Sequence, residues 1–118
     1  MYIYIGSNHN KHCKIKIGKT ENIKRRSSQI KGNNKSFKLH YYYKMDVVND
    51  SQLTALEDVI RGYLAQLQFT FIGKIERQGN DWARVINQTT ANDFIEIIAH
   101  RYERFCTNNN IGFKKVAC

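Results

Sequence analysis

The sequence lacks proline altogether, and it contains no linker rich in glycine and serine and no internal repeat. Its 118 residues are enough to bury one hydrophobic core and too few for two independent ones. These features give no reason to place a domain boundary, so we expect a single domain over residues 1–118. A C-terminal helix is expected over about residues 92–107.

Signals for membrane insertion and export are also missing. No stretch approaches the roughly eighteen consecutive apolar residues that a membrane span needs, and the first residues lack the basic-then-apolar order of a signal peptide. The three cysteines are an odd number scattered along the chain, which suits free thiols in a reducing compartment better than a disulfide framework. We therefore expect a soluble, intracellular protein with no membrane contact.

Acidic residues are scarce in the first third of the chain. Residues 1–44 contain eleven lysines or arginines and one acid, Glu21, whereas residues 45–118 contain eight basic and nine acidic residues. The net charge of +9 is thus concentrated where a surface facing a polyanion would need it. Nucleic acid is the expected partner, DNA first with RNA left open. A charged face that merely keeps the protein in solution is the alternative.

Alternating apolar and polar residues predict the strands. YIYIG and CKIKIG predict a hairpin over about residues 2–6 and 13–18. If the four isoleucines of these segments face the core, the other side of the hairpin is exposed and carries a different set. That set is Tyr2, Tyr4, Lys14 and Lys16.

The rest of the sequence predicts helices that alternate with strands. Thr20 is expected to cap a helix that reaches about Ile30, and a loop follows over about residues 31–36. The segments after it are the strand FKLHYYYKM, a helix from Ser51 to about Gln68, the strands FTFIGKIE and WARVI, and a helix capped by Thr90 or Asn92. The predicted fold is α/β (α+β), a small mixed sheet with the order β-β-α-β-α-β(β)-α covered by helices. The last helix would serve as structural cover or as a homodimer face.

Two charged side chains violate the pattern of their own helices. Glu57 falls about 40° from Leu53 on a helical wheel, inside the apolar stripe of the second helix. A charge in that position is costly unless it is paired or binds a cation. Arg26 points inward on the first helix, whereas Arg25 points about 100° further round. A buried Glu57–Arg26 ion pair without function is one interpretation.

The other interpretation is a site that cleaves phosphodiesters. A carboxylate binds a divalent cation, a guanidinium binds the phosphate, and a hydroxyl or an amine handles the attacking water. Glu57, Arg26, Tyr4 and Lys16 supply these groups inside or next to the basic third of the chain. The basic residues expected to contact nucleic acid are Lys14, Lys19, Arg25, Lys31 and Lys35.

The order of these motifs resembles a known family. Tyr2-Ile3-Tyr4, Lys16-Ile17-Gly18, Arg26 and Glu57 resemble the motifs of the GIY-YIG nuclease superfamily, over roughly residues 1–86. The viral and phage-type branch is more similar still, because its second motif reads KIG and a Trp-containing strand, here NDWARV, follows the glutamate helix. Two residues depart from the superfamily pattern: Tyr2 replaces the first glycine, and Lys16 replaces the second tyrosine.

The resemblance implies an endonuclease that hydrolyses DNA with one Mg²⁺ or Mn²⁺ held by Glu57. In this picture Tyr4 or Lys16 orients or deprotonates the water, and Arg26 offsets the charge that builds up on the phosphate. The choice between Tyr4 and Lys16 as the base stays open. The rival hypotheses are a catalytically degenerate nucleic-acid-binding module of the same fold and a protein-interaction factor without nucleic-acid affinity.

Overall fold

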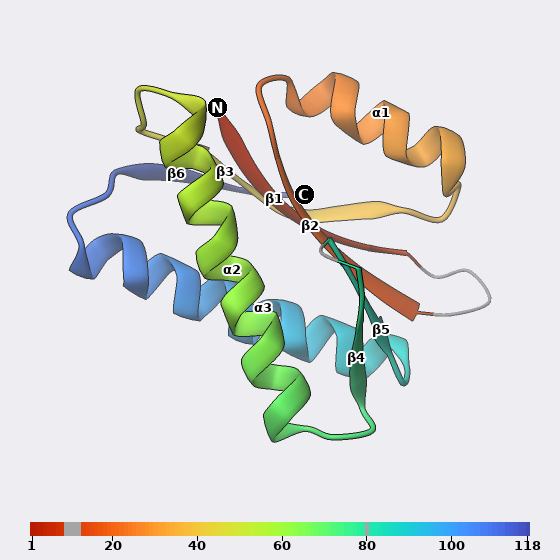
Figure 1. Ribbon diagram of the computed structural model, residues 1–118. Coiled ribbons are helices and arrows are strands. Elements are labelled where there is room, and N and C mark those ends of the chain that lie inside the picture. Colours follow the sequence, from red (N-terminus) through yellow and green to blue (C-terminus); the bar gives the residue numbers. More distant parts are fainter. Residues whose placement is uncertain (9–12, 80) are drawn as a thin grey trace.

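A computed structural model describes residues 1–8, 13–79 and 81–118 of the chain (Figure 1). Most of the turn expected between the first two strands falls on residues 9–12, outside the described residues. Within the described ranges, no helix is both long enough and apolar enough to cross a membrane.

Six strands form one sheet. They are β1 (Tyr2–Asn8), β2 (Cys13–Thr20), β3 (Lys38–Met45), β4 (Ile75–Gln78), β5 (Trp82–Val85) and β6 (Phe113–Ala117). Their order across the sheet is β4-β5-β2-β1-β3-β6, and every neighbouring pair is antiparallel. The predicted α+β class is confirmed. The sheet is antiparallel rather than mixed because β1 lies between β2 and β3, which run in the same direction without pairing.

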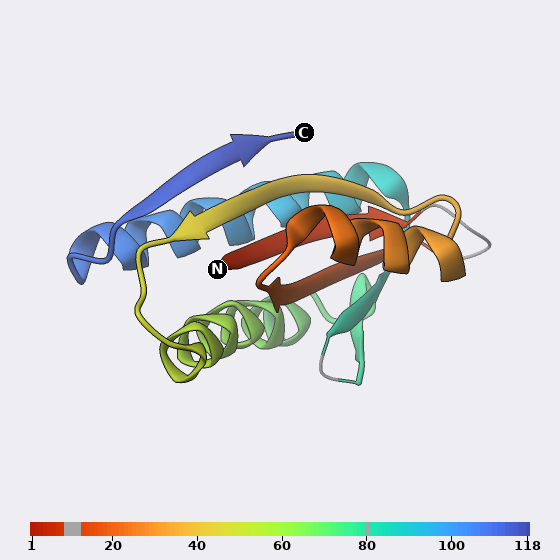
Figure 2. The ribbon, with the colours of Figure 1, turned by 90° about the horizontal axis from the view of Figure 1, so that it is seen from above.

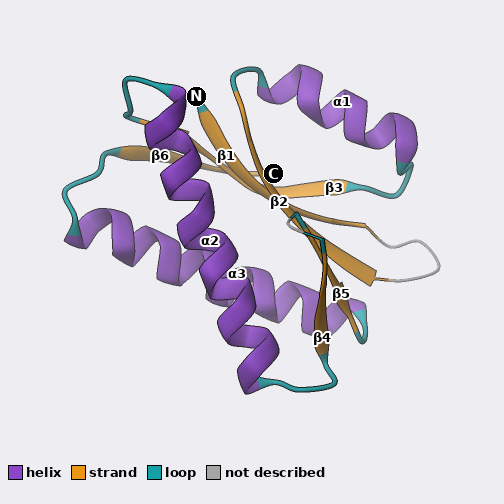
Figure 3. Cartoon of the chain, viewed as in Figure 1, coloured by secondary structure: helices purple, strands orange, loops and turns teal. Residues whose placement is uncertain are grey.

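Three helices cover the two faces of this sheet (Figures 1 and 3). They are α1 (Ile23–Asn33), α2 (Asp50–Thr70) and α3 (Gln88–Asn108). α2 and α3 pack against each other and against one face, and α1 lies alone on the other face (Figure 2). Asparagine side chains cap all three helices: Asn22, Asn49 and Asn87 each accept a hydrogen bond from the backbone N–H three residues further on. The caps expected at Thr20 and at Thr90 or Asn92 were therefore wrong.

The larger part of the core lies between the sheet and the α2–α3 pair. The isoleucines of the hairpin point into it as expected, and so does the leucine and isoleucine stripe of α2. α3 contributes Phe94, Ile98 and Tyr102, all buried, so its inner face is structural cover. This packing fixes α2, and therefore Glu57, against the sheet.

Two segments differ from the prediction. The expected strand over residues 69–76 is mostly the end of α2 and a turn, because α2 continues to Thr70 and β4 begins only at Ile75. The C-terminal tail was not expected to form a strand, yet β6 pairs with β3 at one edge of the sheet. Short apolar runs such as residues 69–72 do not distinguish a helix end from a strand.

A second, smaller core lies beneath α1. Ile30 of α1 and Phe37 pack on Tyr4, with half-buried Trp82 and Tyr42 around them. The hairpin face expected to be exposed is therefore covered in part, and Tyr4 and Lys16 are only 1% and 4% exposed. The prediction that this face is open was wrong, because helix α1 packs over it.

Candidate active site

Tyr4 lies across Gly18 on the α1 side of the sheet. The two residues are direct partners in the β1–β2 register. A Cβ atom added to Gly18 would lie only 2.3 Å from the Tyr4 hydroxyl oxygen, so the ring occupies space that a side chain would otherwise fill. Arg26 reaches down from α1, and its Nε–H donates a hydrogen bond to the Tyr4 hydroxyl at 3.3 Å. The structure therefore joins Tyr4 and Arg26, and Arg25 is exposed as the helical wheel predicted.

Lys16 lies beside them on β2. Its register partner is Trp82 on β5, and its Nζ atom lies 4.7 Å from the centre of the Trp82 ring. The same Nζ lies 3.9 Å from an oxygen of Asp81, the residue just before β5. A cation–π contact and a long ion pair thus hold a nearly buried ammonium group in place.

Glu57 approaches from α2, on the other side of the sheet. It is buried within the apolar stripe, as the sequence indicated. Its Oε1 atom lies 2.7 Å from Nη2 of Arg61, one helical turn further along. The same nitrogen lies 2.7 Å from Asp81. The ion pair considered between Glu57 and Arg26 is therefore replaced, among the described residues, by one with Arg61.

Asp81 connects the two halves of the site. It contacts Lys16 on one side and Arg61 on the other, and Arg61 contacts Glu57. This is possible because the pairing of β2 with β5 ends at Lys16, and the backbone N–H of Ile17 then bonds to the carbonyl of Asp81. Three ion pairs, Lys16–Asp81, Asp81–Arg61 and Arg61–Glu57, therefore connect the two faces of the sheet where the pairing of β2 with β5 ends.

These neighbours shift the proton affinities of the hairpin groups. Burial raises the pKa of the Tyr4 phenol, while the hydrogen bond and charge of Arg26 oppose that rise. Burial lowers the pKa of the Lys16 amine; Asp81 opposes the change and Arg26 adds to it. At neutral pH the phenol therefore stays protonated, and the amine releases its proton more readily than that of an ordinary lysine.

The carboxyl group of Glu57 is shifted as well. Burial raises its pKa, the charge of Arg61 opposes the rise, and the charge of Asp81 adds to it. The charge of Glu57 in turn acts on the pKa of both Tyr4 and Lys16. The four residues selected from the sequence are thus electrostatically connected.

A hollow of about 490 Å³ opens next to this group, between α1 and the β2–β5 region. Lys16, Arg26 and Trp82 line it, together with polar side chains from the end of α1. Tyr4 and Glu57 are not among its lining residues. Of these four residues, Lys16 and Arg26 are therefore the ones that an anion entering the hollow would contact first.

The basic residues expected to contact nucleic acid do not form one cluster. Arg25, Lys31 and Lys35 are exposed on or just after α1, and Lys14 is half-buried on β2. Lys19 lies at the α2 side, where its Nζ donates to Asp50 at 2.7 Å. Lys19 therefore forms a salt bridge at the start of α2, and it does not line the hollow.

Arg61 and Asp81 were not predicted from the sequence. Arg61 carried a local signal, because a Glu–Arg pair four residues apart on a helix places opposite charges side by side. Asp81 carried none, since its contacts join residues 20 and more positions away.

Glu57 has the chemistry of a magnesium ligand. Among the described residues, no three His, Cys, Asp or Glu side chains gather closely enough to form a metal site by themselves. Mg²⁺ is commonly held by only one or two carboxylates, with water and substrate phosphate completing its coordination. A buried carboxylate that already requires a cationic partner, here Arg61, fits that role.

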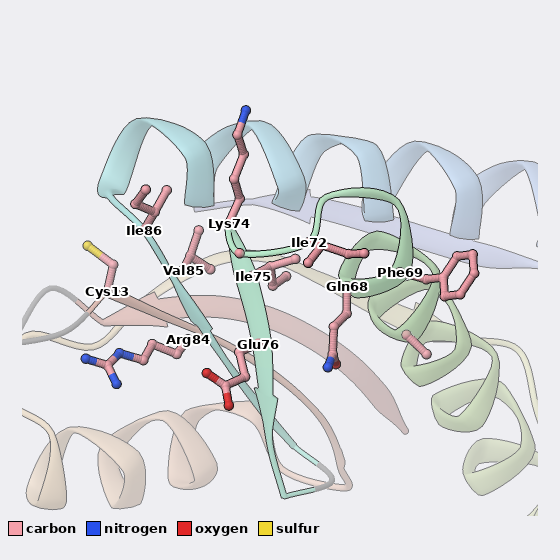
Figure 4. Close-up of a pocket in the computed structure, with 12 residues that line it drawn as sticks. Cys13, Gln68, Phe69, Ile72, Lys74, Ile75, Glu76, Arg84, Val85 and Ile86 are labelled. Atoms are coloured by element: carbon pink, nitrogen blue, oxygen red, sulfur yellow. The ribbon is translucent and has the colours of Figure 1, made fainter.

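A larger hollow, of about 940 Å³, lies elsewhere, around the end of α2 and the β4–β5 pair (Figure 4). Apolar side chains such as Phe69, Ile72 and Ile86 line much of it and are well exposed. Of its charged lining groups Lys74, Glu76 and Arg84, the last two are direct partners across β4 and β5. Tyr4, Lys16, Arg26 and Glu57 do not line this hollow. The larger of the two hollows is therefore not the candidate active site.

Comparison with known protein families identifies the domain to which most of the chain belongs. The T5orf172 domain matches residues 1–99, which is most of the chain. No curated protein and no solved structure matches significantly.

Proposed function

Because the chain belongs to the T5orf172 domain family, whose phage-type modules are related to GIY-YIG-like nucleases, we propose that it is a metal-dependent endonuclease acting on DNA. The observation that carries the proposal is the joining of Tyr4, Lys16 and Arg26 beside one hollow, with Glu57 connected to them through Asp81 and Arg61. Residues from three separate segments supply the acid, the cation and the proton-transfer group that phosphodiester hydrolysis needs.

Arg26 binds the phosphate, and Lys16 lies beside it as the proton-transfer group. Both line the hollow, and Arg26 is half-buried, where its charge is screened less than on an open surface. The Arg26 guanidinium donates one N–H to Tyr4 and one to Gln29, and its remaining N–H groups can donate to phosphate oxygens. Tyr4 acts as a positioning residue, because its protonated phenol fixes the Arg26 side chain at the wall of the hollow.

Lys16 accepts the proton of the attacking water. Its amine is next to the hollow and has a lowered pKa, whereas the raised pKa of Tyr4 keeps the phenol protonated. Glu57 would hold Mg²⁺ or Mn²⁺, which supplies Lewis-acid activation of the phosphate. Since Arg61 already engages Oε1 of Glu57, this metal would compete with the guanidinium.

A plasmid-nicking assay with Mg²⁺ or Mn²⁺ tests the proposal. We expect Glu57→Gln and Arg26→Ala each to lower the nicking rate at least about a hundredfold, as removal of one such electrostatic group does in other enzymes. Arg25→Ala is the matched control, because it removes the same charge from the neighbouring, exposed position. Intact plasmid and branched DNA after incubation of the purified protein with either metal would refute the proposal.

A second candidate is a nucleic-acid-binding module without catalysis. The Glu57–Arg61 pair favours it, since a guanidinium already neutralises the acid that catalysis requires. This candidate predicts DNA binding that is indifferent to EDTA and to Glu57→Gln. Self-association through the outer side of α3 is a separate prediction, which sedimentation would test.

A further inference from the structure

α1 covers only part of its face of the sheet. In Figure 2 the start of β1, the end of β3 and all of β6 extend beyond this helix. The strand register arranges the side chains of this region in rows. Tyr2, Lys44 and Lys114 stand side by side in one row, and Tyr4, Tyr42 and Val116 stand in the next.

The two lysines of the first row face each other across β3 and β6. Both are exposed, and neither forms a salt bridge with a described residue. Like charges at directly opposed positions destabilise a sheet. The acid two residues along the chain, Asp46, lies against Gly112. A phosphate bound between Lys44 and Lys114 would relieve their repulsion.

Tyr2 and Tyr42 add aromatic surface beside these lysines. Their ring centres lie 5.9 Å apart in an edge-to-face arrangement, and both side chains are half-buried. Aromatic side chains next to a positive groove are the usual means of holding single strands, because every base has a face that can stack.

We propose that the tyrosine–lysine platform, formed by Tyr2, Tyr42, Lys44 and Lys114, binds single-stranded nucleic acid and leads it to the candidate active site. Tyr42 is the cross-strand neighbour of Tyr4, whose hydroxyl accepts a hydrogen bond from Arg26, and Arg26 lines the hollow. A duplex keeps its bases stacked within the helix and does not offer their faces to the tyrosines. The identification of the strand as substrate rests on the proposed function.

A second copy of this chain is a poor occupant of the platform. Contact between two identical platforms would bring four unpaired lysines together. A polyanion matches the charge, and its salt dependence gives a direct measure of each lysine.

The test measures binding of labelled dT20 and rU20 strands, and of a labelled duplex of dT20 with dA20, by fluorescence anisotropy, in EDTA and over a range of salt concentrations. The slope of log K against log salt is negative, and we expect Lys44→Ala and Lys114→Ala each to make it less steep by about 0.7. Tyr42→Leu keeps apolar bulk and should weaken single-strand binding about tenfold. Lys115→Ala is the matched control: Lys115 follows Lys114 in β6 but lies on the opposite face, with its Nζ 2.9 Å from Glu103. It should leave the slope unchanged.

Tight binding of dT20 or of rU20 that depends on the platform supports the inference and shows which sugar is preferred. Lysine variants that behave like Lys115→Ala would overturn it, and so would a Tyr42→Leu variant that weakens duplex and single strand equally. Thermal unfolding confirms that Tyr42→Leu is folded. Because binding is measured in EDTA, its failure is distinct from that of the proposed function. A protein that binds through the platform and never cleaves would refute only the nuclease.

Discussion

Replacing Gly18 with alanine is expected to displace the Tyr4 ring and destabilise the fold. The added Cβ would lie 2.3 Å from the Tyr4 hydroxyl oxygen, 2.5 Å from Cζ and 2.9 Å from Cε1. Ordinary contact begins at 3.4 Å, so the ring would have to retreat by about 1.1 Å, which is 3.4 minus 2.3. Tyr4 is only 1% exposed and packs beneath α1, so such a movement disturbs its neighbours.

Overpacking of this kind costs about 1–3 kcal/mol of unfolding free energy. For a chain of this length, the midpoint of thermal unfolding should fall by about 3–12 °C. The assay is urea and thermal unfolding followed by circular dichroism. Gly32→Ala is the control, because Gly32 lies in α1 with nothing within 4 Å of the added Cβ. That substitution should stabilise the protein by about 0.5–1 kcal/mol.

A double-mutant cycle makes the reasoning refutable. Tyr4→Leu removes the ring, so Gly18→Ala should cost little when it is added to that variant. If Gly18→Ala unfolds at the parent temperature, or costs the same with and without the Tyr4 ring, the explanation from close contact is refuted.

Two further predictions concern buried polar groups. Arg61→Met leaves the buried Glu57 carboxylate without its cation, which should cost about 2–4 kcal/mol of unfolding free energy in urea; a second change, Glu57→Gln, should restore much of it. An Arg61→Met variant as stable as the parent would contradict this. Burial raises the pKa of Tyr43, and the hydrogen bond to Glu103 adds to the rise. The unfolded chain therefore loses this proton first, and stability that is complete below about pH 10 should fall above it by up to about 1.4 kcal/mol per pH unit. Tyr43→Phe should flatten this fall between pH 10 and 11, and an unchanged slope would show that Tyr43 does not contribute.

Local patterns predicted those parts of the fold that depend on local periodicity. The isoleucines of the hairpin and the α2 stripe alternate or recur with the correct period, and the structure buries them. Glu57 was identified because one charge interrupted that stripe. The caps were misplaced by a few residues because asparagine and threonine are both good N-caps, and here asparagine occupies each one.

Long-range packing accounts for what the sequence did not show. Nothing in the hairpin itself indicates that α1 folds over Tyr4 and Lys16. The counter-ions of the site were hidden for the same reason, since Asp81 meets Lys16 only after β5 has paired with β2. β6 is a five-residue strand with two lysines, and the strand with which it pairs, β3, is about 70 positions away.

The two outermost strands of the sheet avoid pairing with other chains in different ways. On β4, the backbone N–H of Arg77 already donates to the side chain of Gln68 on α2. On β6, a symmetric antiparallel pairing of two copies centred on that strand would place Lys115 opposite its own equivalent, which is repulsive. Neither edge strand is therefore suited to pair with a strand of another molecule. We expect concentrated solutions of the protein to resist fibre growth.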